Sequence, residues 1–171
     1  MEQDRLAQIR LVVMDVDGVL TDGTLYFMKD GSSIKAFNAY DGAGIVHLHN
    51  SGIQTAIISG RESPEINVRA GELGIQYIYT GIDSKLPVFE TILDKTDIKH
   101  EEAAYIGDDL ADIPPMRASG VSFAPPNSVP EVQETADIVL TRRGGQGAVR
   151  EAAEMILKAS GKWDSVLKDY L

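Results

Sequence analysis

Short apolar runs alternate along this chain with longer amphipathic stretches. The apolar runs are rich in β-branched and aromatic residues, which is typical of buried parallel strands. They predict strands at 9–16, 53–59, 75–79, 103–107, 120–124 and 136–140. The amphipathic stretches predict helices at 41–51, 64–73, 83–96, about 109–118, 128–134 and 147–160. This alternation predicts an α/β fold, a Rossmann-like doubly wound parallel sheet, in a single domain spanning 1–171.

One segment interrupts the alternation between the first strand and the first helix. Residues 23–37 are predicted to form two strands joined at Asp30-Gly31, a dipeptide typical of hairpin turns. The first arm, residues 25–28, is apolar on both faces, whereas an exposed hairpin should have one polar face. Either one face packs on its own domain, or this insert (23–38) forms a subunit interface. We favour the interface because large apolar patches are seldom left exposed.

Composition and charge narrow the classes of function. The 43% hydrophobic and 25% charged content is ordinary for a globular protein, and no apolar run is long enough to span a membrane. The first ten residues lack the apolar core of a signal peptide. The net charge of −10 argues against general nucleic-acid binding, and the absence of cysteine excludes thiolate metal sites. We expect a cytoplasmic protein that binds neither nucleic acids nor membranes.

Polar residues follow three of the predicted strands, and a lysine lies near the start of the helix after another. In open α/β sheets, ligands bind beyond the carboxyl ends of the strands, so we expect these side chains to converge. The candidates are, in chain order, Asp15, Asp17, Ser59, Gly60, Arg61, Lys85, Asp108, Asp109 and Asp112.

These residue types suit phosphoryl transfer assisted by magnesium. Mg²⁺ prefers oxygen ligands and often bridges carboxylates to a substrate phosphate, which fits Asp15, Asp108 and the main-chain carbonyl of Asp17. A carboxylate beside a cation can attack phosphorus, and a second one can transfer protons. The hydroxyl of Ser59 and the ammonium of Lys85 suit phosphoryl oxygens. Taken singly, each motif also has a structural interpretation as a turn, a helix cap or a solvated lysine; their combination favours catalysis.

The motifs resemble those of the haloacid dehalogenase superfamily of phosphatases. The closer resemblance is to the branch that hydrolyses 3-deoxy-D-manno-octulosonate 8-phosphate (KDO 8-phosphate). It is carried by "DVDGVLTDG", "KAFNAYDGAGI", "SGRES", "YIGDDLAD" and "GGQGAVRE", which extend from residue 15 to 151. The resemblance implies a magnesium-dependent phosphatase acting through an aspartyl phosphate in lipopolysaccharide precursor synthesis.

The resemblance also implies a role for each candidate residue. Asp15 would be the nucleophile and Asp17 the general acid and base. Magnesium would be held by Asp15, the carbonyl of Asp17, and Asp108. Ser59 and Lys85 would bind the phosphoryl group. Asp109 and Asp112 would support the metal site and Lys85.

The branch forms homotetramers in which a neighbouring subunit covers each active site. The spacing of the predicted elements leads independently to the expectation that a neighbouring subunit covers the active site. Only a hairpin fits between the first strand and the first helix, and only one helix and one strand fit between Ser59 and Lys85. Neither gap holds a cap domain, which needs about 50 residues. The lid must therefore come from the substrate or from another subunit.

Two residues bear on the choice of substrate. Arg61 matches the KDO 8-phosphate branch and could pair with a substrate carboxylate, or it could be a solvated loop residue. Tyr40 stands where that branch usually has arginine, which weakens the assignment. The alternatives are the phosphatase of a nine-carbon, sialic-type keto acid 9-phosphate or of another small sugar phosphate. An inactive regulatory module of the same fold is the alternative from another class.

The remaining polar and aromatic residues are interpreted as structural. His47, His49 and His100 are expected to be structural, and Asp22 to form a turn that leads into the hairpin. The stretch 142–151 is either the start of the final helix, as the resemblance implies, or a plain loop and helix. The tail 161–171, with Trp163 and Tyr170, would dock on a neighbour or fray.

Overall fold

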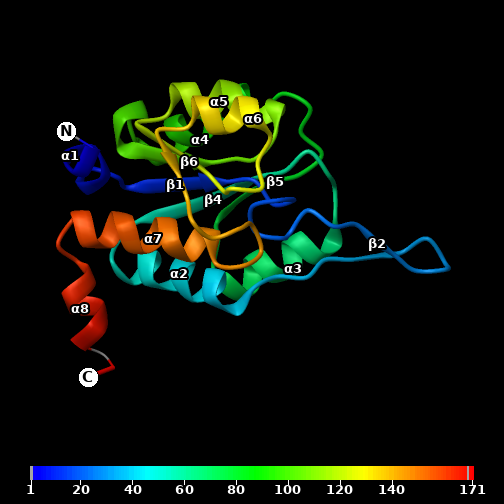
Figure 1. Ribbon diagram of the computed structural model, residues 1–171, viewed down its shortest axis with the longest axis horizontal. Helices are drawn as coiled ribbons and strands as arrows, with labels where there is room; N and C mark the ends of the chain where they lie inside the picture. The colour runs from blue at the N-terminus through cyan, green and yellow to red at the C-terminus, as the bar shows by residue number, and fades with distance from the viewer. Residues whose placement is uncertain (1, 169) are drawn as a thin grey trace.

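The computed structural model describes residues 2–168, 170 and 171 (Figure 1). Met1 and Asp169, which the predicted ranges 1–171 and 161–171 include, lie outside the described residues. A parallel sheet of six strands forms the centre, in the order β5-β4-β1-β6-β7-β8. The strands are β1 (Leu11–Met14), β4 (Gln54–Ile58), β5 (Tyr77–Tyr79), β6 (Ala103–Ile106), β7 (Val121–Ala124) and β8 (Ile138–Val139).

Helices cover both faces of this sheet, which confirms the doubly wound α/β fold. In Figure 1, α2, α3 and α7 lie on one side of the strands, and α4, α5 and α6 lie on the other. The helices are α1 (Glu2–Ala7), α2 (Ala39–Asn50), α3 (Pro64–Leu73), α4 (Lys85–Thr96), α5 (Ile113–Ala118), α6 (Pro130–Thr135), α7 (Ala148–Ala159) and α8 (Trp163–Lys168). The longest have twelve residues, so none of the described helices could cross a membrane.

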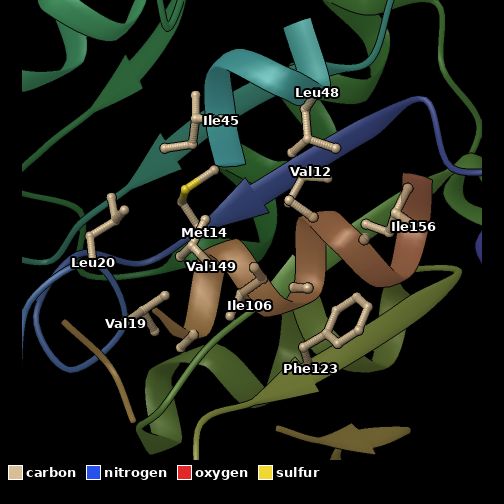
Figure 2. Packing of buried hydrophobic residues seen from close by; sticks show 14 of the residues in the cluster. Val12, Met14, Val19, Leu20, Ile45, Leu48, Ile106, Phe123, Val149 and Ile156 are labelled. Atoms are coloured by element: carbon tan, nitrogen blue, oxygen red, sulfur yellow. The ribbon is translucent and has the colours of Figure 1, made fainter. Parts of the chain in front are cut away.

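The central strand β1 shows why apolar runs without alternation form this sheet. All four of its residues are buried, because successive side chains point to opposite faces and both faces are covered. Val12 and Met14 pack with α2 and α7, as Figure 2 shows, while Leu11 and Val13 belong to the second cluster under α4 and α5. The two cores hold the carboxyl ends of the strands at one edge of the sheet.

One predicted helix was wrong in its bounds, and one helix was not predicted. The helix expected at about 109–118 is a 3-10 turn, Leu110–Asp112, followed by the short helix α5. The turn is stabilised by the side chain of Asp109, which accepts a hydrogen bond from the backbone of Leu110 at 2.8 Å. The helix α1 was not predicted, because its six residues carry charges of both signs and bury only Leu6.

The inserted hairpin is present, with strands of two residues each, β2 (Tyr26–Phe27) and β3 (Ser33–Ile34). It projects from the body of the molecule (Figure 1). Every residue from 25 to 28 is exposed, and Phe27 is 68% exposed. Within this chain, therefore, the interpretation that one face packs on its own domain is wrong.

The part of the tail from Trp163 to Lys168 forms the helix α8, which packs on its own chain and so does not fray, while docking of the tail on a neighbour stays a prediction. The ring of Trp163 in α8 lies under two cations of α7, with Arg150 at 5.5 Å and Lys158 at 5.3 Å from its centroid. His47 of α2 meets the same ring edge-on at 6.1 Å. The structural roles of His49 and His100 are also confirmed by their hydrogen bonds within the fold.

Candidate active site

The end of β1 brings Asp15 to the carboxyl edge of the sheet. Its backbone N–H donates to the carbonyl of Ile106 at 3.0 Å, so the pairing of β1 with β6 continues to this residue. Gly18 then turns the chain with φ of +90°, a conformation that side chains rarely adopt. A Cβ at this position would lie 1.9 Å from Oδ2 of Asp108. Glycine is therefore required by the backbone and by the neighbouring carboxylate together.

Lys85 lies beneath Asp15 as the first residue of α4. It is 5% exposed, and its Nζ contacts Oδ1 of Asp15 at 2.9 Å and Oδ1 of Asp112 at 2.7 Å. Burial by itself would lower the pKa of Lys85, but the two carboxylates outweigh that effect and raise it. Lys85 is therefore a fixed cation beside the candidate nucleophile.

Asp112 is fully buried and uses both carboxylate oxygens within the protein. Besides Lys85, it accepts a hydrogen bond from the hydroxyl of Tyr105 at 2.9 Å. Its other oxygen accepts from the backbone N–H groups of Asp108 and Asp109, at 3.1 and 3.2 Å. These contacts support the prediction that Asp112 holds Lys85 and the loop after β6. Asp109 is exposed at the rim and caps the 3-10 turn.

Asp108 completes a cluster of three acids whose oxygens lie within 4.8 Å of one another, together with Asp15 and Asp112. Burial and the charge of Asp112 raise the pKa of Asp15 to about 6, against the influence of Lys85. Burial and the charges of Asp15 and Asp112 raise the pKa of Asp108 to about 8. Carboxylates crowded in this way favour a divalent cation, which would lower their mutual repulsion.

The donor set fits magnesium, because one of its oxygens has no partner in the protein. Oδ1 of Asp108 is buried without a hydrogen-bond partner among the described residues. Asp112 has no such free oxygen, so the carboxylate ligands would be Asp15 and Asp108. Oxygen ligands of this kind are those that Mg²⁺ prefers. The predicted third ligand, the main-chain carbonyl of Asp17, stays a prediction.

The side chain of Asp17 is not part of this cluster and lies beside two cations. Nζ of Lys35 donates to its Oδ1, and Nε of Arg61 lies 3.8 Å from its Oδ2. Sequence analysis placed Arg61 at the site but missed Lys35. The sequence gives little indication of this contact, because Lys35 lies on an inserted hairpin eighteen positions from Asp17.

A pocket of about 340 Å³ opens over these groups. The hydroxyl of Ser59 is buried in its wall and accepts a hydrogen bond from the backbone N–H of Arg61 at 3.3 Å. The structure therefore brings every predicted site residue to this pocket except Asp112, which lies beneath it. The lining residues are Asp15, Asp17, Gly23, Leu25, Ser59, Gly60, Arg61, Ile82, Lys85, Asp108, Asp109 and Ala111.

The glycine-rich stretch before α7 packs against the catalytic loop, which is the segment 15–23 after β1. Sequence analysis also missed this role. The backbone N–H of Gly144 donates to Oδ1 of Asn127 at 2.7 Å, and Nδ2 of Asn127 donates to the carbonyl of Gly18 at 3.0 Å. A Cβ on Gly144 would lie 1.7 Å from that carbonyl oxygen. Close packing of backbones thus explains the glycine at this position, and the stretch leads into α7 at Ala148, as the resemblance implied.

A second hollow, of about 480 Å³, lies at the start of β4 and β5, which is the opposite edge of the sheet. Its side chains include His49, Gln54 and Thr55, and it contains no carboxylate or lysine. Its described lining therefore lacks both a carboxylate nucleophile and the lysine that phosphoryl transfer would use here. The candidate active site is therefore the smaller, charged pocket.

Comparison with known proteins agrees with this arrangement. A family model for haloacid dehalogenase-like hydrolases matches residues 38–120. The 3-deoxy-D-manno-octulosonate 8-phosphate phosphatase of Haemophilus influenzae is 42% identical over 160 residues, covering 94% of this chain and 89% of that protein. Its counterpart in Escherichia coli K12 is 44% identical over 156 residues, covering 91% and 83%.

Solved structures show the same similarity in three dimensions. The 3-deoxy-D-manno-octulosonate 8-phosphate phosphatase of Moraxella catarrhalis, in complex with magnesium, phosphate and KDO, superposes with a TM-score of 0.97 at 40% identity, covering 99% of this chain and 97% of that one. This protein belongs to the KDO 8-phosphate phosphatases, a family of haloacid dehalogenase-like hydrolases, and is a phosphatase.

Proposed function

We propose that this phosphatase hydrolyses KDO 8-phosphate to KDO and inorganic phosphate with Mg²⁺ as cofactor. One observation carries the proposal: Asp15 lies between the buried ammonium of Lys85 and the partnerless carboxylate oxygen of Asp108, at the floor of an open pocket. Relatives 42–44% identical to this chain are named as phosphatases of that substrate. The bound groups of the Moraxella structure are consistent with it.

Magnesium would be held by the carboxylates of Asp15 and Asp108 and by the main-chain carbonyl of Asp17. When bound, it neutralises charge on the phosphoryl oxygens and orients the phosphoryl group toward the nucleophile. The hydroxyl of Ser59 and the ammonium of Lys85 donate to the other phosphoryl oxygens. Lys85 also holds the carboxylate of Asp15 in place through the contact at 2.9 Å.

In the first step, a carboxylate oxygen of Asp15 attacks phosphorus. The bond between phosphorus and the sugar oxygen breaks, and its electron pair goes to that oxygen. The carboxyl group of Asp17 gives it a proton, so KDO leaves as an alcohol. Asp15 then carries the phosphoryl group as an acyl phosphate.

In the second step, the carboxylate of Asp17 takes a proton from water as the water oxygen attacks phosphorus. The bond between phosphorus and Asp15 breaks, and its electron pair returns to the Asp15 carboxylate. Inorganic phosphate leaves and Asp17 is protonated again, so the cycle is balanced. The position of Asp17 at the pocket wall, outside the acidic cluster, suits this exchange with substrate and water.

Arg61 at the rim would pair with the carboxylate of the substrate, because its side chain is 58% exposed and lines the pocket. The 9-phosphate of a nine-carbon keto acid is the alternative substrate, because the assignment to KDO 8-phosphate is weakened by Tyr40. This residue is 68% exposed at the start of α2, where the family usually has arginine. The two substrates differ in length, so Arg61 and Tyr40 are the residues to compare.

A second subunit would complete the pocket. We propose a homotetramer in which the hairpins pack together, because the apolar side chains of residues 25–28 are uncovered in the single chain. We further propose that the reaction takes place in the cytoplasm, in lipopolysaccharide precursor synthesis. Fractionation of cells that express the protein would test the location.

The decisive experiment is a phosphate-release assay of the purified protein with Mg²⁺. The panel contains KDO 8-phosphate, a nine-carbon keto acid 9-phosphate and hexose phosphates, compared by kcat/KM. The highest kcat/KM is expected for KDO 8-phosphate. A higher kcat/KM for the nine-carbon substrate would overturn the proposed substrate and leave the proposed mechanism unchanged.

The same assay tests the nucleophile and the metal. EDTA or the substitution Asp15→Asn is expected to abolish phosphate release, since the amide cannot form the acyl phosphate. Release at the wild-type rate by Asp15→Asn would refute the nucleophile assignment. No release by the wild-type protein from any substrate would favour the inactive regulatory module.

A further inference from the structure

Lys35 differs from the other residues of the hairpin in its burial. The strand residues Tyr26, Phe27, Ser33 and Ile34 are exposed, yet the side chain of Lys35, directly after β3, is only 7% exposed. Its Nζ donates to Oδ1 of Asp17. A lysine is almost never buried without an acidic partner, so the contact with Asp17 determines where this side chain lies.

The hairpin arm that leads to Lys35 is bonded to the start of α3. The hydroxyl of Ser33 donates to Oε1 of Glu65 at 3.0 Å, and the hydroxyl of Ser63 donates to Oε2 at 2.5 Å. Ser33 and Lys35 are two positions apart on an extended segment, so they share a face. The hairpin is therefore tied to the body beside the candidate active site and directs Lys35 toward it.

Lys35 reaches Asp17 from outside the substrate pocket. It lines an adjoining hollow of about 270 Å³ between the hairpin and the loop after β4, whereas it does not line the pocket over Asp15. Only Leu25 and Arg61 belong to both. The ammonium therefore contacts the Asp17 carboxylate without lining the substrate pocket, so it can orient that group without contacting the substrate.

We propose that Lys35 is a positioning residue for the reaction, which holds the Asp17 carboxylate toward the leaving oxygen and so makes the hairpin part of its own chain's active site. The inference rests on the proposed function. Arg61 cannot take over the role of Lys35, because Nε of Arg61 is 3.8 Å from Asp17 and the side chain of Arg61 is mostly exposed. The hairpin then has a catalytic role in its own subunit, distinct from any contact with a neighbour.

The test compares three phosphate esters with Lys35→Met, which removes the charge and keeps the length. KDO 8-phosphate and a hexose 6-phosphate both release alcohols that need a proton, but only the first has a carboxylate. The third, p-nitrophenyl phosphate, releases an anion that needs none. The kcat/KM value reports the steps up to and including cleavage of the bond between phosphorus and the leaving oxygen. We expect kcat/KM to fall roughly tenfold or more for both alcohols and much less for p-nitrophenyl phosphate.

The other outcomes contradict the proposal. A loss confined to KDO 8-phosphate would make Lys35 a ligand of the substrate carboxylate, and an equal loss on all three would make its role structural. The exposed hairpin residue Lys29 provides the matched control, and Lys29→Met is expected to keep wild-type values on all three. Lys35→Arg is expected to recover part of the lost activity.

A second measurement examines the pairing directly. In the background of Asp17→Asn, the further change Lys35→Met is expected to cause little additional loss, because Lys35 acts through Asp17. Full additivity of the two losses would refute the proposal. If Lys35→Met does not fold, Ser33→Ala is measured instead. Its kcat/KM is expected to fall less than that of Lys35→Met for the two alcohol esters, and again to change little for p-nitrophenyl phosphate. An inactive wild-type protein would instead refute the proposed function, so the two failures are distinguishable.

Discussion

At the carboxyl edge of the sheet, oppositely charged side chains lie within a few ångströms of one another. Asp15 and Lys85 are both buried, and each lowers the cost of burying the charge of the other. Asp108 approaches the backbone of Gly18 so closely that no side chain fits between them. The catalytic loop therefore depends on the absence of one methyl group as much as on its carboxylates.

At this scale we predict that Gly18→Ala disrupts the metal site. The φ of +90° costs about 1–3 kcal/mol of stability for a residue with a Cβ. The Cβ would also displace Asp108, and misplacement by about 1 Å can cost on the order of 100-fold in rate. Isothermal titration with Mg²⁺ and kcat measurements should both show the loss.

Gly52→Ala provides the control for this substitution. Gly52 has a φ of +77°, but a Cβ there would meet nothing within 4 Å. It should therefore lose a similar amount of stability while keeping wild-type Mg²⁺ affinity and kcat. Unchanged Mg²⁺ affinity in Gly18→Ala would contradict the predicted displacement of Asp108.

Elements far apart in the sequence are joined by Asp137, which precedes β8. Its carboxylate accepts hydrogen bonds from the N–H and hydroxyl of Ser122 in β7, both at 2.9 Å, and from Arg5 of α1 at 2.9 Å. Burial would raise the pKa of Asp137, but these hydrogen bonds outweigh it and lower the pKa. The ionised carboxylate therefore stabilises the edge of the sheet.

This shift predicts a pH-dependent contribution to stability. Since the folded-state pKa lies below the ordinary value, the contribution is present above about pH 4 and is lost as the pH falls through the folded-state pKa. Asp137→Asn should lower the free energy of unfolding by about 1 kcal/mol at pH 7, a modest value because Asp137 is partly exposed. Urea unfolding at several pH values measures it.

The difference between Asp137→Asn and the wild-type protein should shrink as the pH falls below about 4. The exposed Asp94 of α4 offers a control, and Asp94→Asn should change stability little at any pH. A deficit of Asp137→Asn that is the same at pH 7 and pH 3 would show that the ionised carboxylate is not the cause.

At the scale of the whole molecule, the hairpin gathers several exposed apolar side chains among the described residues, on a chain whose net charge is −10. The side chains of Tyr26, Phe27 and Ile34 are between 47% and 68% exposed. Burying such side chains against another copy contributes about 1.5–3 kcal/mol each. Assembly through the hairpin would thus offset the cost of association and exclude water from the pocket beside it.

At this scale we predict that Phe27→Asp weakens assembly. Light scattering should show the wild-type protein as an oligomer and the variant as smaller species, since a charge would be buried in the contact. Its kcat/KM should fall for KDO 8-phosphate more than for p-nitrophenyl phosphate, which is too small to need the neighbour. Val139→Asp, on the edge strand β8 and 44% exposed, serves as the control. A monomeric wild-type protein would remove the basis for a shared pocket.

The order of strands and helices and most of the candidate site were predictable from sequence. Asp15, Ser59 and Asp108 each follow an apolar run, so the fold class was enough to bring them to one edge. Lys35 and Asn127 were not predictable. Their partners, Asp17 and Gly18, lie on other segments, and a lysine on a hairpin or an asparagine in a loop is usually solvated.

The sequence by itself determined the parallel sheet, the site at its carboxyl edge and the acidic character of that site. It could do so because periodicity and strand ends are local features that survive without knowledge of the packing. Only the tertiary structure decided which carboxylate oxygen is left without a partner, that α8 packs on its own chain, and that Lys35 meets Asp17. Those facts depend on distances between segments remote in sequence, which hydrophobic patterning does not encode.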